Sequence, residues 1–389
     1  MPLVKPGFPE TSASTLFMAK KSSKRLMGVG IIGCGNISNA YFQHTKPFAD
    51  YVKIVACADI DVERAKSKAA EQGLGKGYSV EELLADPEVD IVLNLTIPAA
   101  HATVNQQALK AGKHAYCEKP FGLNYKEGLK TFNDATKRKL RVGCAPDTVL
   151  GGGIQTCRKL IDDGAIGRPV AATANMMGHG PEGWHPNPDF FYQPGGGPLF
   201  DMGPYYLTSL VTMLGPVKSV AASSTISFKE RMIGSKPLAG QKIKVRTPTH
   251  HCGVLEFAQG AIATVTMSFD VWAHHVPLLE IYGTEGSIQC PDPNHFNGDV
   301  LLWTTKKREW TKVPLTHNGD TGRGIGIADM ANAIQNRRPH RASGELGLHV
   351  VEVMESFQAS WKAGKRIALK SKVRQPEAMP AGLALGRLS

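Results

Sequence analysis

The chain has 389 residues, of which 42% are hydrophobic and 20% are charged, so it is long enough to bury two separate cores. Of the net charge of +11, residues 1–26 hold five basic and one acidic side chain and residues 362–389 hold seven and one, which leaves only +1 for the body of the chain. This distribution argues against a nucleic-acid partner, and the lack of any apolar run near the roughly 18 residues of a membrane helix argues against a membrane protein.

The basic segment at residues 1–26 is expected to be flexible, because it lacks an apolar pattern. From residue 27 to residue 145 the chain alternates short apolar runs with helical periodicity, which is typical of βαβ units in a parallel sheet. Five strands are predicted, at residues 28–32, 53–58, 91–96, 114–117 and 140–144. The helices between them have recognisable ends: the segments Ser79–Glu82 and Asn124–Glu127 resemble capping boxes, and Gly112 resembles a left-handed stop. These features predict a doubly wound α/β domain over residues 27–145.

The pattern changes after Pro146, where glycine- and proline-rich loops separate strands at hairpin spacing. Two hairpins are predicted, one from residue 252 to residue 269 and one from residue 300 to residue 313. Helices are predicted at residues 152–162, 204–213, 325–336 and 345–363. We therefore expect a second domain over residues 146–372, with a largely antiparallel sheet, helices on one face and two terminal helices that close it. Residues 373–389 are expected to be a flexible tail.

A glycine-rich turn, Gly33-Cys34-Gly35-Asn36-Ile37-Ser38, follows the first predicted strand and opens a helix. Such a turn brings backbone N–H groups to the pyrophosphate of a dinucleotide at the helix N-terminus. We therefore expect Gly33, Gly35, Asn36 and Ile37 to bind a cofactor. Ser38 stands where the third glycine of the motif is usual, so an ordinary tight turn remains the alternative.

The second strand ends at Asp59, 24 residues after Gly35. An acidic side chain there accepts hydrogen bonds from the adenosine ribose and repels a 2′-phosphate, which favours NAD over NADP. Two alternatives remain, namely that Asp59 is a helix cap and that Arg64 turns toward a phosphate. The third strand leads into Thr96, Pro98 and His101, which are expected at the same sheet edge beside the cofactor, with a structural histidine as the alternative.

The fourth strand ends in Glu118-Lys119-Pro120. The residue before a proline is disfavoured in a helix, so Lys119 should project from the carboxyl edge of the sheet, where ligands bind in open α/β folds. A desolvated lysine can exchange a proton near neutral pH, as oxidation of an alcohol requires. A solvated loop lysine is the alternative.

In the second half, a glycine run at Gly195 leads to Asp201 and Tyr205, whose spacing of four residues places both on one face of a helix start. A tyrosine beside a lysine cation can act as a general acid or base. The alternatives are a helix-capping aspartate and a core tyrosine. The preceding loop is rich in aromatic and polar side chains that suit a sugar ring, and we expect Trp184 and His185, together with Tyr206, to contact a substrate.

These motifs together resemble the family of glucose-fructose oxidoreductase, inositol dehydrogenase and MocA over residues 27–369. The resemblance implies a Rossmann domain followed by an α/β domain with a large open sheet that also serves contacts in a homo-oligomer, a dimer or tetramer. It implies that Lys119 is the catalytic lysine, that Glu118 lies beside the nicotinamide ribose and that Asp201 orients the substrate. Many members have a histidine four residues after that aspartate, whereas Tyr205 stands here, as in some members. The expected proton carrier is therefore Tyr205, assisted by Lys119.

The sequence thus predicts a cytoplasmic NAD-dependent oxidoreductase that acts on a sugar, a sugar derivative or a cyclic polyol. One alternative is a redox-neutral enzyme with tightly bound NAD, and another is a nicotinamide-dependent sensor without catalysis. No metal is expected, because the seven cysteines lack metal-binding spacing, and their apolar surroundings predict reduced, mostly buried thiols.

Overall fold

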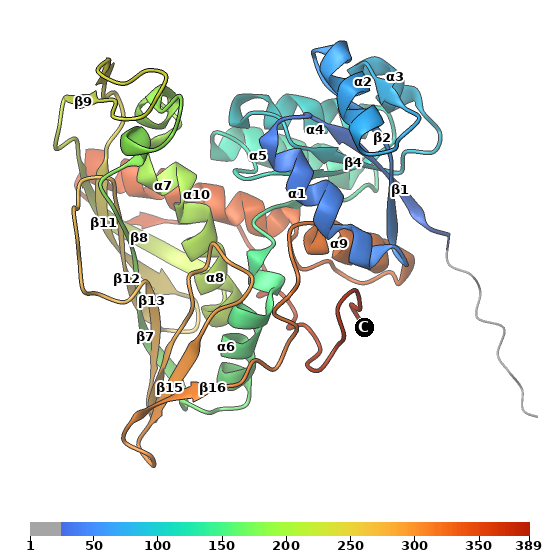
Figure 1. Cartoon of the computed structure of the whole chain (residues 1–389). Helices are drawn as coiled ribbons and strands as arrows, with labels where there is room; N and C mark the ends of the chain where they lie inside the picture. Colours follow the sequence, from blue (N-terminus) through green and yellow to red (C-terminus); the bar gives the residue numbers. More distant parts are fainter. Residues whose placement is uncertain (1–24) are drawn as a thin grey trace, which may run out of the picture.

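The computed structural model describes residues 25–389, which form two lobes that each contain one large β-sheet (Figure 1). The prediction of a flexible N-terminal segment lies outside the described residues, apart from its last two positions. Of these, Arg25 forms an ion pair with Asp90 at 2.8 Å.

The sheet of the N-terminal lobe is parallel and has the strand order β3-β2-β1-β4-β5-β6. Its strands are β1 (Met27–Ile32), β2 (Val52–Ala58), β3 (Gly77–Tyr78), β4 (Ile91–Asn94), β5 (His114–Cys117) and β6 (Val142–Cys144). This is the order of the Rossmann fold, in which ligands bind beyond the carboxyl ends of the strands where the order reverses, here between β1 and β4. All five predicted strands are confirmed, and β3 was missed because two residues are too few to show an apolar pattern.

The helices of this lobe begin and end at the signals that the sequence contains. They are α1 (Asn36–His44), α2 (Val62–Glu71), α3 (Val80–Ala85), α4 (His101–Lys110) and α5 (Tyr125–Lys137). Ser79 and Glu82 form the expected reciprocal capping box at α3, and the Asn124 side chain caps α5 by accepting a hydrogen bond from the Glu127 N–H. Gly112 has the predicted left-handed backbone after α4, with φ of 76°.

The second lobe is built on a nine-stranded sheet of order β16-β15-β14-β13-β7-β12-β11-β8-β17. Its strands are β7 (Pro169–Met177), β8 (Val217–Thr225), β11 (His250–Phe257), β12 (Ile262–Ser268), β13 (Leu279–Gly283), β14 (Gly286–Gln289), β15 (Val300–Thr304), β16 (Trp310–Val313) and β17 (Ile367–Ala368). Only β7 and β12 pair in parallel within this sheet. Both predicted hairpins, β11–β12 and β15–β16, are present.

Three long helices pack on one side of this sheet, as predicted. They are α6 (Gly152–Asp162) against β15, α8 (Gly203–Leu214) against β7, and α10 (Gly344–Ala363) against β8. Figure 1 shows them between the sheet and the N-terminal lobe. Helix α8 is buried along its whole length, so it forms the centre of this layer.

The last two helices were predicted to close the second domain, and they also pack against the N-terminal lobe. Helix α9 (Ile325–Gln335) packs against β2 and β6 of the N-terminal sheet. Helix α10 contacts α5 and β6 as well as α8 and β8. The helices therefore join the two lobes, which sequence periodicity does not show because it identifies an apolar face and not the partner that covers it.

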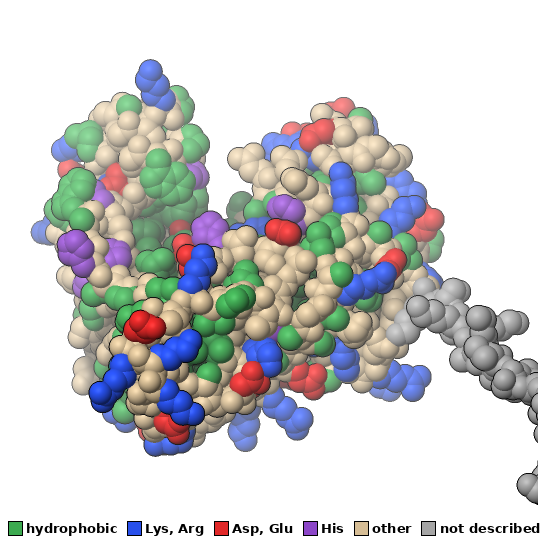
Figure 2. All heavy atoms as spheres, turned by 60° about the horizontal axis from the view of Figure 1, so that its bottom comes forward, with side chains coloured by type: hydrophobic (Ala, Val, Ile, Leu, Met, Phe, Trp, Pro, Cys, Tyr) green, Lys and Arg blue, Asp and Glu red, His purple; other side chains and the backbone are tan. Residues whose placement is uncertain are grey.

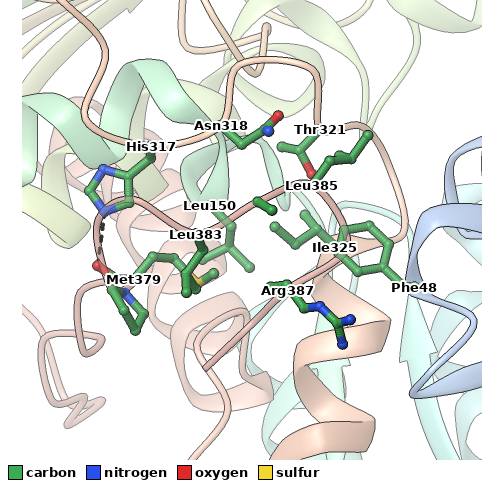
Figure 3. A pocket seen from close by; sticks show the side chains of 13 residues that line it. Phe48, Leu150, His317, Asn318, Thr321, Ile325, Met379, Leu383, Leu385 and Arg387 are labelled. Atoms are coloured by element: carbon green, nitrogen blue, oxygen red, sulfur yellow. Dashed lines mark hydrogen bonds between the residues drawn. The ribbon is translucent and has the colours of Figure 1, made fainter.

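The predicted flexible tail is instead packed along the surface as a C-terminal strap, residues 373–389. The Met379 N–H donates to the Gln155 side chain at 2.7 Å, and the Met379 carbonyl is 2.9 Å from Nε2 of His317. Figure 3 shows strap side chains lying against Phe48 of the N-terminal lobe. Leu388 is completely buried. Isolated apolar residues in a basic stretch show no periodicity, which is why the sequence failed to indicate this packing.

The strap should therefore contribute to stability. Replacing Leu388, which is 0% exposed, by alanine is expected to lower the free energy of unfolding by about 2–5 kcal/mol. The matched control is Leu385→Ala, because Leu385 is 41% exposed and its loss should cost less than about 1 kcal/mol. Urea unfolding of both variants measures the difference, and equal stabilities would show that the strap is not held in solution.

Within residues 25–389, no helix combines the length and the apolar content that crossing a bilayer would require. All seven cysteines are free thiols, and six of them are buried while Cys252 is exposed. The prediction of mostly buried cysteines is thereby confirmed.

Candidate active site

The glycine turn after β1 leaves open space at the N-terminus of α1. Gly33 has φ of 106°, and a Cβ there would lie 2.7 Å from the backbone of Leu95, so glycine is required. At Gly35, the N-cap residue of α1, a Cβ would meet no atom within 4 Å. No side chain caps this helix end, so the first N–H groups of Asn36 and Ile37 are directed at that space. The turn therefore fits a dinucleotide pyrophosphate.

Ser38, at the position of the missing third glycine, is fully buried. Its hydroxyl donates to the Gly35 carbonyl at 2.7 Å and closes the turn. The departure from the usual motif is thus accommodated by a local hydrogen bond.

Asp59 lies at the end of β2 and supports the same turn. One carboxylate oxygen accepts the Cys34 N–H at 2.8 Å, and the other accepts the Asp61 N–H at 3.1 Å. The cap of α2 is Asp61, so the alternative that Asp59 caps this helix is wrong. Arg64 is half exposed and lies 3.4 Å from Asp59 and 3.5 Å from Asp61.

The loop after β4 places Thr96 and Pro98 at the edge of the sheet, with Pro98 exposed, and holds His101 beneath it. The two ring nitrogens of His101 lie 3.0 Å from the Thr96 carbonyl and 2.8 Å from the Pro120 carbonyl. Burial lowers the pKa of His101, although both carbonyls oppose this effect. The geometry favours the structural alternative for His101, which joins this loop to the turn after β5.

Lys119 projects from the end of β5 into the boundary between the lobes. Its ammonium group donates to the backbone carbonyl of Asp201 at 2.7 Å and to the carboxylate of Asp201 at 3.0 Å. It also lies 5.3 Å from the centre of the Tyr205 ring. The structure thus brings together the three side chains predicted to be catalytic, from positions more than 80 residues apart in the chain.

The charge of Lys119 differs from the first expectation of a lysine that exchanges protons near neutral pH. Burial lowers its pKa, but the neighbouring Asp201, Tyr205 and Glu118 raise it by more, and the net shift is upward. Lys119 is therefore a permanent cation at neutral pH. This suits a group that polarises a substrate oxygen and does not suit one that carries a proton.

Asp201 and Tyr205 stand on two consecutive helices and not on one helix. Helix α7 (Gly197–Asp201) ends at the aspartate, and α8 begins at Gly203 after a break at Met202. Asp201 is partly exposed, whereas Tyr205 is 4% exposed. The break turns both side chains toward Lys119.

The hydroxyl of Tyr205 contacts a cation that the sequence did not indicate. Arg323, in the loop before α9, donates from Nη2 to this hydroxyl at 3.1 Å and from Nη1 to the Glu118 carboxylate at 3.3 Å. The cation nearest the phenolic oxygen is therefore Arg323, while Lys119 faces the ring. Arg323 belongs to no motif in the sequence, so only its position next to the glycines Gly322 and Gly324 could have hinted at a fixed loop.

Glu118 is buried and joins the two lobes at this point. Its carboxylate accepts hydrogen bonds from the Tyr41 hydroxyl at 2.9 Å and from the Lys119 N–H at 3.1 Å, in addition to Arg323. Burial, with Glu118 as the next cause, raises the pKa of Tyr41, so its hydroxyl remains a donor. These bonds orient Glu118 at the carboxyl edge of β5, where a nicotinamide ribose is expected.

The three predicted substrate contacts have different environments. Trp184 is 70% exposed, and His185 packs edge-on against Phe190 and Phe191. Figure 2 shows a deep notch between the N-terminal lobe and the lobe that contains β9 (Glu230–Met232), with hydrophobic and histidine side chains on the latter. Tyr206 is 1% exposed in the core, so the structure does not support a substrate contact there. Its neighbour Tyr205 points to the other side of the helix.

Comparison with known proteins finds a matching family model for each of the two lobes. The model of the "oxidoreductase family, NAD-binding Rossmann fold" matches residues 27–145, and the "GFO/IDH/MocA C-terminal domain" matches residues 154–289. An uncharacterised oxidoreductase of Schizosaccharomyces pombe is 26% identical over 47% of this chain and half of its own length. The 1,5-anhydro-D-fructose reductase of Ensifer adhaerens is 27% identical over 61% of this chain and 67% of its own. The myo-inositol 2-dehydrogenase of Thermotoga maritima is 24% identical over 76% of this chain and 80% of its own length.

Solved structures show the same fold. An NAD-binding oxidoreductase from Klebsiella pneumoniae has a TM-score of 0.78 at 22% identity, covering 90% of this chain and 100% of that one. Levoglucosan dehydrogenase in complex with NADH and levoglucosan has a TM-score of 0.76 at 20% identity, with the same coverage.

Proposed function

The chain belongs to the GFO/IDH/MocA family of oxidoreductases, and on this basis we propose that it transfers a hydride between NAD and a carbon–hydroxyl group of a sugar, a sugar derivative or a cyclic polyol. Relatives named for sugars and inositols support this substrate class. The main observation is the group formed by Lys119, Asp201 and Tyr205 at the boundary between the lobes, because it combines a cation, a carboxylate and a hydroxyl.

The bound nicotinamide would accept the hydride from the substrate carbon, and the protein would handle the remaining proton. Tyr205, as the phenolate, takes the proton of the substrate hydroxyl while the carbon–oxygen double bond forms. An ammonium group has three donors, and two of those of Lys119 are used by Asp201, so the third can polarise the substrate oxygen. Asp201 accepts a hydrogen bond from a neighbouring substrate hydroxyl.

The test of this function is an assay of reduced nicotinamide absorbance against monosaccharides, inositols, glycosides and their keto forms. We expect turnover with at least one of them. No response from any sugar or polyol with either NAD or NADP would contradict the proposal.

The preference for NAD rests on the carboxylate of Asp59. Asp59→Asn keeps an oxygen for the Cys34 N–H but removes the charge that repels a 2′-phosphate. We expect the ratio of kcat/KM for NAD to kcat/KM for NADP to fall about tenfold, equivalent to about 1.4 kcal/mol. Glu63→Gln, which removes an exposed carboxylate from α2, serves as the control. An unchanged ratio in Asp59→Asn would mean that Arg64, and not Asp59, decides the preference.

The open face of the nine-stranded sheet supports a homo-oligomer, a dimer or tetramer. Val254 on β11 and Ile262 on β12 are 41% and 52% exposed on the face away from the helices. Light scattering coupled to size-exclusion chromatography measures the mass, and a monomer would contradict this assignment.

A further inference from the structure

We propose that Arg323 is a positioning residue of the reaction, which orients the phenolic oxygen of Tyr205 and stabilises it as the phenolate. This inference rests on the proposed function, in which Tyr205 exchanges a proton with the substrate oxygen. It adds a residue that no motif of the sequence contains.

The guanidinium of Arg323 forms a fork between two side chains from different lobes. Nη2 donates to the Tyr205 hydroxyl at 3.1 Å, and Nη1 donates to the Glu118 carboxylate at 3.3 Å. Arg323 is largely buried, so water screens its charge only weakly. Burial lowers its pKa, but Glu118 and Tyr205 raise it by more, so it remains protonated.

The chemistry of the contact determines what Arg323 can do. A guanidinium only donates hydrogen bonds, whereas a phenolic oxygen has one hydrogen and two lone pairs. Arg323 therefore occupies a lone pair of Tyr205 and leaves the proton directed at a third group, which is the substrate oxygen. When Tyr205 is a phenolate, the adjacent positive charge favours that form.

Two cations face Tyr205, and they have different roles. Lys119, at the end of β5, is held by Asp201 and lies over the ring face, whereas Arg323 contacts the oxygen itself. The carboxylates of Asp201 and Glu118 are the partners of these two cations, and within residues 25–389 neither carboxylate forms a hydrogen bond with Tyr205. The two positive charges are therefore balanced by two negative charges. The hydrogen bond from Arg323 places one of the positive charges next to the phenolic oxygen of Tyr205.

A buried carboxylate fixes the loop that contains Arg323. Asp147, just after β6, accepts the N–H groups of Gly324 at 2.8 Å and Gly326 at 3.1 Å, on the C-terminal side of Arg323. A Cβ on Gly326 would lie 2.1 Å from the Tyr116 hydroxyl, so the loop is also pressed against the sheet. The N-terminal lobe thus holds Arg323 in place to meet a tyrosine of the second lobe.

The test measures the ionisation of Tyr205 directly and needs no substrate. Tyrosine labelled with ¹³C at the hydroxyl-bearing ring carbon is titrated by NMR in the full-length protein with NAD, and Tyr205→Phe identifies the signal. In Arg323→Gln we expect the midpoint of this ionisation to move to higher pH by about one unit or more. Arg323→Lys keeps a charge without the fork and should move it less.

Arg366→Gln is the matched control, because Arg366 is 63% exposed and pairs with Glu256 on the surface. Its Tyr205 midpoint should equal that of the wild type. An unchanged midpoint in a folded Arg323→Gln would overturn the proposal. If Arg323→Gln does not fold, a midpoint in Arg323→Lys equal to that of the wild type would overturn it.

Once a substrate is known, the pH profile gives a second readout. The acidic limb of kcat for alcohol oxidation should move to higher pH in Arg323→Gln, which lowers turnover at pH 7 about tenfold, while the Kd for NADH stays within about twofold. Added guanidinium ion should restore part of the loss. If turnover falls by the same factor at every pH and guanidinium ion does not restore it, Arg323 is only structural. Failure of the sugar panel alone would contradict the proposed function and leave the NMR result standing.

Discussion

Replacing Tyr205 by phenylalanine is expected to lower kcat about 10²–10⁴-fold, the range that one general acid or base contributes. The ring remains, so Lys119 keeps its contact with the aromatic face and the buried position stays filled. Only the hydroxyl that meets Arg323 is lost. Steady-state kinetics and NADH binding by fluorescence measure the effect, and binding should be nearly unchanged.

A matched control removes a tyrosine hydroxyl elsewhere. Tyr125 lies at the start of α5 beside α10, and its hydroxyl does not belong to the group formed by Lys119, Asp201 and Tyr205, so Tyr125→Phe should keep wild-type kcat. If Tyr205→Phe also keeps wild-type kcat, the proton passes through another group, and the proposed mechanism is wrong.

The second large effect is expected at Lys119. Lys119→Met keeps an unbranched side chain beside Tyr205 but removes the donor that polarises the substrate oxygen. We expect kcat to fall about 10²–10³-fold, the cost of losing one such donor. Because the pKa of Lys119 is raised, the lysine is charged throughout neutral and mildly alkaline pH, so the loss should be the same from pH 6 to pH 9.

The control is Lys126→Met, on the exposed side of α5, which should not affect turnover. A Lys119→Met enzyme that recovers activity at low or high pH would contradict a permanent cation. Removal of Lys119 also leaves Asp201 without its ion pair. The loss of kcat in the double variant Lys119→Met, Asp201→Asn should therefore be smaller than the product of the losses in the two single variants.

The fold could be predicted from the sequence wherever local patterns decide it. Short apolar runs identified five strands of the N-terminal sheet, and helix α6 begins and ends at the predicted residues Gly152 and Asp162. The capping box at Ser79 and the stop at Gly112 were also correct, because backbone N–H groups at helix ends are satisfied by residues a few positions away.

Other features could not be predicted, because they depend on partners far along the chain. The strap at residues 373–389 is held by contacts with residues such as Gln155 and His317, which have no sequence signal directed at it. The sequence assigned Tyr205 as the proton carrier and Tyr206 as a substrate contact, and only the packing of α8 shows that Tyr206 is 1% exposed in the core while the Tyr205 hydroxyl meets Arg323. Arg323 became visible only through its distances to Glu118 and Tyr205.

The sequence by itself determined the glycine turn after β1, the lysine at the end of β5 and the family, because glycine geometry and strand ends are local properties. The tertiary structure decided which charge each side chain faces: Lys119 pairs with Asp201, and Arg323 contacts the oxygen of Tyr205. The physical reason is that electrostatic interactions depend on separation in space and on burial, and neither follows from separation along the chain.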